Sequence, residues 1–578
     1  MIKLLKEYTR DGLLAAFLGP IFTILEVIFD SLIPLVMADI IDKGIYALGG
    51  DMNYILNRGI QMVLLALAAA VCGSLSGLFS SISSTKFVRN IRMSMFEKIQ
   101  TYSFENIEKY PVPTVIMRLT TDMRMLRMAY VSIVRLLARA PFNLIISAYF
   151  VFTLNSGLSK IFLFAIPILG IGLIFIFKFA HPRFRAMMLK FDDLDANLEE
   201  NIDGIRVVKT FVREDYENEK FKKSSFAVTK AQRFAESIVI LNRPFFELVM
   251  YSCMILIAWI GGRDVIAQEM STGDFMAFLS YVRTILFSLL MISNVYLQIV
   301  MAQASVDRAN EILNEVPSVS DKDANPDLEV EDGTIEFNNV SFKYSSEAEN
   351  NALSNINLKI KSGELIGILG PTGSSKSTLV QLIPRLYDVS EGEIKVAGHN
   401  VKEYKLDTLR NAVAMVLQKN TLFSGTIEEN MKWGNPDASH EEVVEACKNA
   451  QAHDFIMARE KGYDTDLGQG GVNVSGGQKQ RLCIARALLK KPKIIILDDS
   501  TSAVDTDTDH RIQLALKEKL NNMTTIIIAQ RVASVKEADR IIIMNNGVIE
   551  DVGNHDELMK RNDVYRDLYN TQMEGVRE

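Results

Sequence analysis

The stretch that decides the fold of the second half of the chain is Leu365-Ile-Gly-Ile-Leu-Gly-Pro-Thr-Gly-Ser-Ser-Lys-Ser-Thr378. An apolar run, Leu365–Leu369, leads into a glycine-containing loop that ends in Lys376, Ser377 and Thr378. This order of strand, loop and helix start is the P-loop pattern, in which backbone N–H groups and a helix N-terminus surround phosphate groups. The sequence therefore predicts a phosphate site in an α/β domain.

The loop residues have separate expected parts in this site. Lys376 would neutralise the β- and γ-phosphates, and the Ser377 hydroxyl would bind Mg²⁺. Ser375 stands where the pattern has glycine, and its Cβ would crowd a backbone that must approach phosphate closely. We expect binding to survive, because the lysine and the hydroxyl are present. The residues expected to surround the phosphates are Gly370, Pro371, Thr372, Gly373, Ser374, Ser375, Lys376, Ser377 and Thr378.

Residues 333–578 read as an α/β domain that follows a polar, proline-containing linker at 316–332. The buried strand Ile494–Leu497 ends in Asp498, which suits Mg²⁺ coordination through water, and in Asp499. Ser475, Gly476, Gly477 and Gln478 begin a helix and can close over a γ-phosphate. The expected strands are Ile335–Phe337, Leu365–Leu369, Ala412–Leu417, Lys493–Leu497, Thr524–Ile528 and Arg540–Met544.

The first part of the chain is a helical membrane domain, expected to comprise residues 1–315. Spanning a bilayer takes about 20 mainly apolar residues in a helix. The connections 84–130 and 181–236 are long and rich in Lys and Arg, which predicts that they, the N-terminus and the α/β domain are cytoplasmic in a multi-pass protein of the cell (inner, cytoplasmic) membrane. The expected spans are residues 13–37, 57–83, 131–154, 160–180, 237–261 and 274–300.

Charged residues inside these spans suggest function, because they are costly there. Their spacing of four places the members of each pair on one helix face. Ion pairing between helices around a wet cavity is the favoured interpretation, since the two signs balance, and cation binding by Glu26 and Asp30 is the alternative. The pairs are Glu26 with Asp30, Arg135 with Arg139, and Arg243 with Glu247.

Composition agrees with a membrane part joined to a soluble part. Hydrophobic residues make up 48% of the 578 residues, and mean hydropathy is +0.12. The net charge of -7 argues against a general nucleic-acid binder, which needs a basic surface. The four cysteines lie far apart and form no CxxC, which excludes a disulfide framework and a CxxC zinc or redox site.

Six spans followed by a P-loop, by Val474–Gln478 and by the strand ending in Asp498 resemble an ATP-binding cassette (ABC) exporter half-transporter over essentially the whole chain. The resemblance implies ATP and Mg²⁺ as cofactors and a lipid bilayer as the environment. It also implies a dimer in which each ATP lies between the P-loop of one subunit and the signature, here Ser475–Gln478, of the other.

The resemblance implies further roles for single residues. Tyr344 matches the aromatic residue that stacks on adenine. Gln418 matches the glutamine that senses Mg²⁺ and the transmembrane contact, and Asp505 belongs to the D-loop, Ser502–Asp505. Residues 114–122 and 209–216 match the two coupling helices of the family.

Four positions depart from the family pattern. Asp499 stands where the water-polarising Glu is usual, and its shorter side chain moves the carboxylate by more than ~1 Å, which can cost roughly 10²-fold in rate. Gln530 stands in the place of the switch histidine and cannot become cationic. Gln469 replaces an acid in the loop Leu467–Gly471, and Ser375 replaces glycine.

These departures, beside an intact signature, predict a degenerate ATP site in one subunit of a bacterial heterodimeric, multidrug-type exporter of amphipathic compounds. A non-identical half-transporter would be its partner. The alternatives are a slow homodimeric exporter of lipids or peptides and an ATP-gated regulatory membrane protein with little turnover. A soluble ATPase of the same superfamily is disfavoured by the six spans.

Overall fold

The computed structural model describes residues 7–47, 50–345, 348–499, 506–519 and 523–574. The chain forms two compact units, one of Met1–Lys98 with Val112–Asn314 and one of Ile99–Pro111 with Glu315–Glu578. The short segment Ile99–Pro111 thus belongs with the α/β unit, whereas the sequence assigned all of residues 1–315 to the membrane domain.

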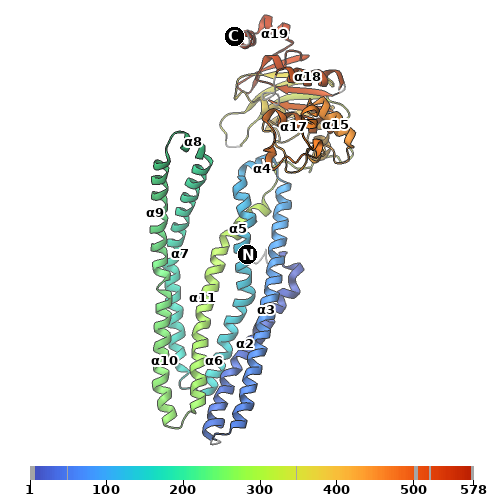
Figure 1. Ribbon diagram of the computed structural model, residues 1–578. Coiled ribbons are helices and arrows are strands. Elements are labelled where there is room, and N and C mark those ends of the chain that lie inside the picture. The colour runs from blue at the N-terminus through green and yellow to red at the C-terminus, as the bar shows by residue number, and fades with distance from the viewer. Residues whose placement is uncertain (1–6, 48–49, 346–347, 500–505, 520–522, 575–578) are drawn as a thin grey trace. The chain divides into compact units, whose positions relative to one another are not determined.

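The first unit is built from long helices (Figure 1). Among the described residues, six helical runs are long and apolar enough to cross a membrane, and they contain the six expected spans. In chain order its elements are η1 (Arg10–Gly12), α2 (Leu13–Asp39), the π-helix η2 (Ile40–Ala47), α3 (Met52–Gln100, whose last two residues belong to the second unit), α5 (Val112–Val131), the π-helix η3 (Ser132–Leu136), α6 (Leu137–Leu154), α7 (Lys160–Asp203), α8 (Ile205–Thr210), α9 (Glu214–Val239), α10 (Asn242–Ile266) and α11 (Thr272–Asn314).

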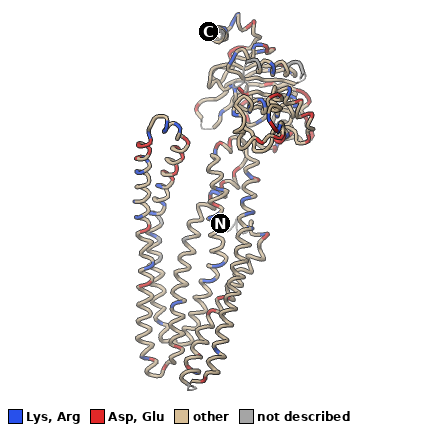
Figure 2. The backbone as a smooth tube through the Cα atoms, in the orientation of Figure 1, with Lys and Arg blue, Asp and Glu red and all other residues tan. Residues whose placement is uncertain are grey.

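The surface of these helices suits lipid. Large apolar side chains such as Phe17, Leu163 and Trp259 are 68%, 73% and 76% exposed, which a water-soluble surface rarely shows at this density. Figure 2 shows that charged residues are sparse along the middle of the long helices and frequent near α8 at the tip of the α7–α9 hairpin.

Polar contacts tie α11 to α5 and α2. Asp122 accepts hydrogen bonds from Arg308 Nε at 2.7 Å and from Ser305 Oγ at 2.8 Å. Farther along the bundle, the buried Tyr281 hydroxyl donates to the Ser31 carbonyl at 2.5 Å. The basic and acidic residues of the segment Arg118–Asp122 therefore serve the packing of the membrane unit, with Arg118 paired to Glu311 at 2.9 Å.

Neither range predicted as a coupling helix forms a separate short helix. Residues 114–122 lie inside α5, which runs unbroken from Val112. The short helix α4 (Phe104–Lys109) precedes it and ends before Pro111, because the residue before a proline disfavours helix. Its N-terminus carries a capping box of Ser103 and Asn106. Residues 209–216 cover the end of α8 (Ile205–Thr210), a left-handed backbone position at Val212 with φ of 52°, and the start of α9.

The α/β unit contains a mainly parallel six-stranded sheet in the order β10-β9-β3-β8-β7-β6 and an antiparallel sheet in the order β2-β1-β4-β5. All six predicted strands are present, and the strands β2, β4, β5 and β10 were not predicted. The strands are β1 (Ile335–Phe342), β2 (Leu353–Ile360), β3 (Leu365–Leu369), β4 (Glu391–Val396), β5 (His399–Asn400), β6 (Val413–Val416), β7 (Ile494–Asp498), β8 (Thr524–Ile528), β9 (Arg540–Asn545) and β10 (Val548–Gly553).

Alternate residues of the central strands face two hydrophobic cores. Leu365 and Leu369 of β3 pack with the helices α14–α17, whereas Ile366 and Ile368 pack with the antiparallel sheet. The strands are therefore apolar on both faces, as parallel strands usually are. The helices of this unit are α12 (Lys376–Gln381), α13 (Leu406–Ala412), α14 (Ile427–Met431), α15 (His440–Asn449), α16 (His453–Met457), η4 (Gly462–Asp464), η5 (Gln469–Gly471), α17 (Gly476–Leu489), α18 (Thr506–Lys519), η6 (Val532–Ser534), α19 (His555–Arg561) and α20 (Asp563–Glu574).

Candidate nucleotide site

The phosphate loop follows the carboxyl end of β3. Gly370 has φ of +154°, and a Cβ there would lie 2.1 Å from the backbone oxygen of Met544, so only glycine fits. Ser375 caps α12 in the left-handed region with φ of 66°, the conformation that glycine adopts without cost. The serine thus keeps the loop shape that a glycine would have, at the expense of backbone strain.

Lys376 lies across the inside of the loop. Its Nζ donates to the carbonyl oxygens of Gly370 at 2.9 Å and Pro371 at 2.8 Å. Burial lowers the pKa of the Lys376 ammonium, and the nearby charges of Asp499 and Asp498 oppose that shift. A cation held by uncharged carbonyls at the start of a helix suits an anionic phosphate, so the loop fits the group that its sequence predicts.

Ser377 and Asp498 meet at the place where the sequence expected a metal. Ser377 Oγ donates to Asp498 Oδ1 at 2.9 Å, which joins the first turn after the P-loop to the end of β7. Burial raises the pKa of Asp498, and the hydrogen bond from Ser377 opposes the shift. A hydroxyl and a carboxylate are oxygen ligands of the kind that Mg²⁺ prefers.

Asp499 is held by two amides. Gln530 Nε2 donates to Asp499 Oδ2 at 2.8 Å, and Gln418 Nε2 lies 3.4 Å from the same oxygen. Burial raises the pKa of Asp499, and these two hydrogen bonds oppose the rise. The backbone at Asp499 is left-handed with φ of 48°, a conformation that Asp tolerates better than most residues.

Tyr344 lies beside the phosphate loop. Its hydroxyl is 2.8 Å from Thr378 Oγ1, and its ring packs edge-on against Phe342 and Tyr387 with centroids 4.9 and 5.4 Å away. The side chain remains 43% exposed, so part of the ring is open to a ligand. Burial raises the pKa of its phenol, which stays neutral.

The signature residues form the N-terminus of α17. The Ser475 side chain accepts from Gln478 N at 3.3 Å, and Gln478 Oε1 accepts from Ser475 N at 3.1 Å, which makes a capping box. Arg459, which the sequence did not single out, donates to Gln478 Oε1 at 3.3 Å and to the Asn473 carbonyl at 2.9 Å. The signature residues thus lie on α17, a different element from the phosphate loop and α12.

Other predicted residues lie elsewhere. Gln469 begins η5, and the D-loop residues Ser502–Asp505 fall outside the described residues. Gln480 was missed by sequence reasoning; it is fully buried, and its amide lies 3.5 Å from the Asp499 carbonyl.

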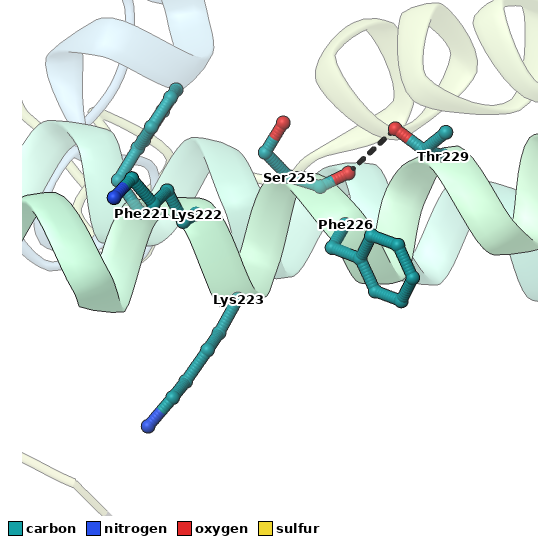
Figure 3. Close-up of a pocket in the computed structure, with 6 residues that line it drawn as sticks. All are labelled: Phe221, Lys222, Lys223, Ser225, Phe226 and Thr229. Carbon is teal, nitrogen blue, oxygen red and sulfur yellow. Dashed lines mark hydrogen bonds between the residues drawn. The ribbon is translucent and has the colours of Figure 1, made fainter.

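A shallow hollow lies along α9 in the membrane unit and adds no nucleotide ligand to this set (Figure 3). It is lined by Phe221, Lys222, Lys223, Ser225, Phe226 and Thr229.

Most of the charged residues predicted to pair in the membrane unit form ion pairs, whereas Arg135 Nη2 donates to the Gly73 carbonyl at 3.5 Å. Arg139 bridges two carboxylates of α2, with Nη1 2.8 Å from Glu26 Oε1 and Nη2 3.4 Å from Asp30 Oδ2. A Cβ on Gly73 would lie 2.8 Å from Glu26 Oε1, so the glycine makes room for this carboxylate. Arg243 pairs with Glu247 at 2.9 Å.

Two family models match the chain in the order of its two units. Residues 16–290 match the ABC transporter transmembrane region, and residues 353–502 match the ABC transporter domain. The chain is also 37% identical over 492 residues to the uncharacterized ABC transporter ATP-binding protein YknU of Bacillus subtilis, covering 85% of this chain and 84% of that one. The chain belongs to the ABC transporter family.

Further relatives agree with an ABC exporter half-transporter. The ATP-dependent lipid A-core flippase of Desulfotalea psychrophila is 36% identical over 489 residues, 84% of each chain. The putative multidrug export ATP-binding/permease protein YgaD of Bacillus subtilis is 31% identical over 578 residues, 99% of this chain and 98% of that one. The exporter half-transporter is therefore a multi-pass membrane protein with an ATP-binding, transport-coupled ATPase domain.

Proposed function

We propose that this half-transporter is one subunit of a heterodimeric exporter of amphipathic compounds and that its own ATP site is degenerate. The contact of Asp499 with Gln530 and Gln418 carries the proposal. A general base must lie within hydrogen-bond reach of the attacking water, whereas the short Asp499 side chain is tied to two amides through Oδ2. Gln530 has no ionisable group with which to assist.

ATP would be bound by the loop Gly370–Thr378 and stacked by Tyr344. Lys376 would turn from the loop carbonyls to the phosphates, and Ser377, Asp498 and Gln418 would hold Mg²⁺, directly or through water. When bound, Mg²⁺ neutralises part of the phosphate charge. Asp499, held as it is, would activate water poorly, so this site would keep its nucleotide through many cycles of the partner.

The signature would serve the other site of the dimer. Ser475 and Gly477 stand at the start of a helix of 14 residues, where free N–H groups and the helix dipole favour an anion. In a dimer of this family they would face the ATP on the partner's P-loop. This half-transporter would thus hydrolyse weakly at its own site and complete a competent one, in the inner, cytoplasmic membrane with both the N-terminus and the ATPase domain inside.

The test is steady-state ATP turnover of the purified chain, alone and with a second, non-identical half-transporter, in lipid nanodiscs. We expect turnover well below ~1 s⁻¹ alone and faster turnover with the partner. After turnover, the nucleotide bound at this P-loop should be ATP more often than ADP. A homodimer of this chain with rapid turnover would contradict the proposal.

A second candidate is a homodimeric exporter of lipids. The relative named a lipid A-core flippase favours it, since the identity spans 84% of both chains. Transport assays with a fluorescent amphipathic cation and with a fluorescent phospholipid, using the chain with and without a partner, separate the two. Lipid transport by the chain alone would support this candidate.

The ion pairs of α2 give a test of the membrane half. Glu26 and Asp30 both pair with Arg139, so Glu26→Gln and Asp30→Asn should change substrate preference or the balance of inward and outward states. Nucleotide binding should stay the same. Unchanged transport of every tested substrate would leave these residues as packing partners only, and Arg243→Gln is the control from another ion pair.

A further inference from the structure

The loop that carries Gln530 is held from two sides by glutamine side chains. It runs from the end of β8 through Gln530 to η6 (Val532–Ser534). Gln513 of α18, which is 7% exposed, donates through Nε2 to the Ser534 carbonyl at 2.8 Å. This hydrogen bond fixes the end of the loop at Ser534. The residues at the start of the loop are held by a second glutamine.

Gln572, near the end of α20, holds the first residues. Its Nε2 donates to the Gln530 carbonyl at 3.0 Å, and its Oε1 accepts from the Val532 N–H at 2.8 Å. A primary amide presents a donor and an acceptor side by side, so one side chain pairs with both backbone groups. Aspartate, glutamate, lysine or serine at this position could not make both bonds in the same way.

The helix that carries Gln572 is itself anchored. Tyr565 of α20 is 1% exposed. It lies in the hydrophobic core that Leu365 and Leu369 of β3 share with α14–α17. Its hydroxyl lies 2.7 Å from His555 Nδ1, and its backbone N–H donates to Asn562 Oδ1 at 2.9 Å. Gln572 therefore extends from a fixed base two turns farther along the helix.

The loop position matters because the Gln530 side chain reaches Asp499 at 2.8 Å. An N–H···O bond spans about 2.7–3.2 Å, so a backbone shift of about 1 Å would break it. The bonds of Gln572 act on the peptide groups on both sides of Arg531 and so limit such a shift directly. Without them, the Gln530 amide would sample positions away from both Asp499 and a bound γ-phosphate.

We propose that Gln572 is a positioning residue of the nucleotide site, which couples the C-terminal helix α20 to the contact between Gln530 and Asp499. Its removal releases the loop, and nucleotide held at this chain's P-loop dissociates faster. This inference rests on nucleotide binding by the ABC domain and does not need the heterodimer. Helix α20 thus contributes to the rate at which nucleotide dissociates from this site.

The experiment compares Gln572→Ala and Gln572→Glu with Asn570→Ala, the matched removal of an exposed amide from the same helix. Each variant is made in the full-length chain in lipid nanodiscs. Hydrogen exchange of the segment 529–534 and release of mant-ATP with Mg²⁺ are measured, and both are repeated in the Gln530→Ala background. Gln572→Glu keeps the volume and can still accept from Val532 N, but it donates nothing to the Gln530 carbonyl.

We expect Gln572→Ala to speed exchange in this segment and to speed mant-ATP release by roughly three- to tenfold, the range for one net hydrogen bond. Gln572→Glu should fall between Gln572→Ala and the parent chain, and Asn570→Ala should match the parent. In the Gln530→Ala background the effect of Gln572→Ala on release should disappear, because the two residues act in one path.

Two results would overturn the proposal. One is unchanged exchange at 529–534 in both Gln572 variants. The other is an effect on mant-ATP release that is the same with and without Gln530, which is what a general loss of domain stability produces. If Gln572→Ala does not fold, the Gln572→Glu variant and its Gln530→Ala double variant decide the question by the same two measurements.

Discussion

The phosphate loop and the signature of the ATPase domain differ in backbone strain and in how their polar side chains are held. At the phosphate loop, Ser375 occupies a left-handed backbone position and Asp499 is held by two glutamines. At the signature, Ser475 and Gln478 form a regular capping box at the start of a long helix. This difference is what the proposed division of labour predicts: the surface offered to a partner is kept while the hydrolytic groups of the chain's own site change.

The sharpest way to test this difference is to damage the signature. Ser475→Arg or Gly477→Asp should reduce ATP turnover of the complex by at least ~100-fold, since a side chain or a negative charge would stand against phosphate. Nucleotide binding at this chain's own P-loop is the control and should be unchanged. Mild signature variants would mean that the two sites are assigned the wrong way round.

Removal of the P-loop lysine should have the next largest effect. Lys376→Ala deletes the cation that lies inside the loop, so mant-ATP affinity at this chain should fall by at least ~10-fold, which is about 1.4 kcal/mol. Titration of the full-length chain measures it. Lys405→Ala changes an exposed lysine of the same domain and should bind as the parent does; equal affinity in both variants would rule out the loop as the phosphate site.

Neutralising Asp499 should matter less. In the complex, Asp499→Asn should lower total ATP turnover by less than about tenfold, because this carboxylate contributes little to the hydrolysis that the partner's site performs. Steady-state ATPase of the complex measures it beside the signature variants. A crippling Asp499→Asn would show that this chain's site is a competent one.

The smallest effect concerns the strained serine. Ser375→Gly relieves the backbone strain at φ of 66° and should stabilise the ATPase domain by about 1 kcal/mol, or raise its unfolding temperature by about 2–4 °C. Thermal unfolding of the full-length chain measures it. Ser375→Ala keeps the Cβ and should give no gain, so an equal rise in both variants would exclude backbone strain as the cause.

Local sequence patterns were enough to predict much of the molecule. Apolar runs of membrane length predicted six spans, and the buried strand before Gly370 predicted the P-loop, because both depend on neighbouring residues alone. Strands β2, β4, β5 and β10 were missed. Their apolar residues are few or alternate with polar ones. Strands β2, β5 and β10 form by pairing with the strand just before them in the chain, and β4 forms by pairing with β1.

The short helices α4 and α8 also begin and end at residues that the sequence did not indicate. Residues 114–122 carry a charged motif that resembles a functional segment, but Arg118 and Asp122 pair with α11 inside a continuous helix. The short helix α4 ends before Pro111, and its side chain Asn106 donates to Glu315 at 3.0 Å, more than 200 residues later in the chain. The spacing of residues along the sequence does not predict contacts with such distant partners.

By itself, the sequence determined the family and the order of the two units, and it predicted the groups that would surround a phosphate, since these follow from motifs whose residues are neighbours. Only the tertiary structure decided that Asp499 is held by Gln418 and Gln530, which are 81 and 31 residues away. It alone brought Gln572 of the last helix onto the Gln530 loop, 42 residues away. Parallel strands end at one edge of a sheet whatever their separation along the chain, and that packing, which no local pattern encodes, sets the contacts of the site.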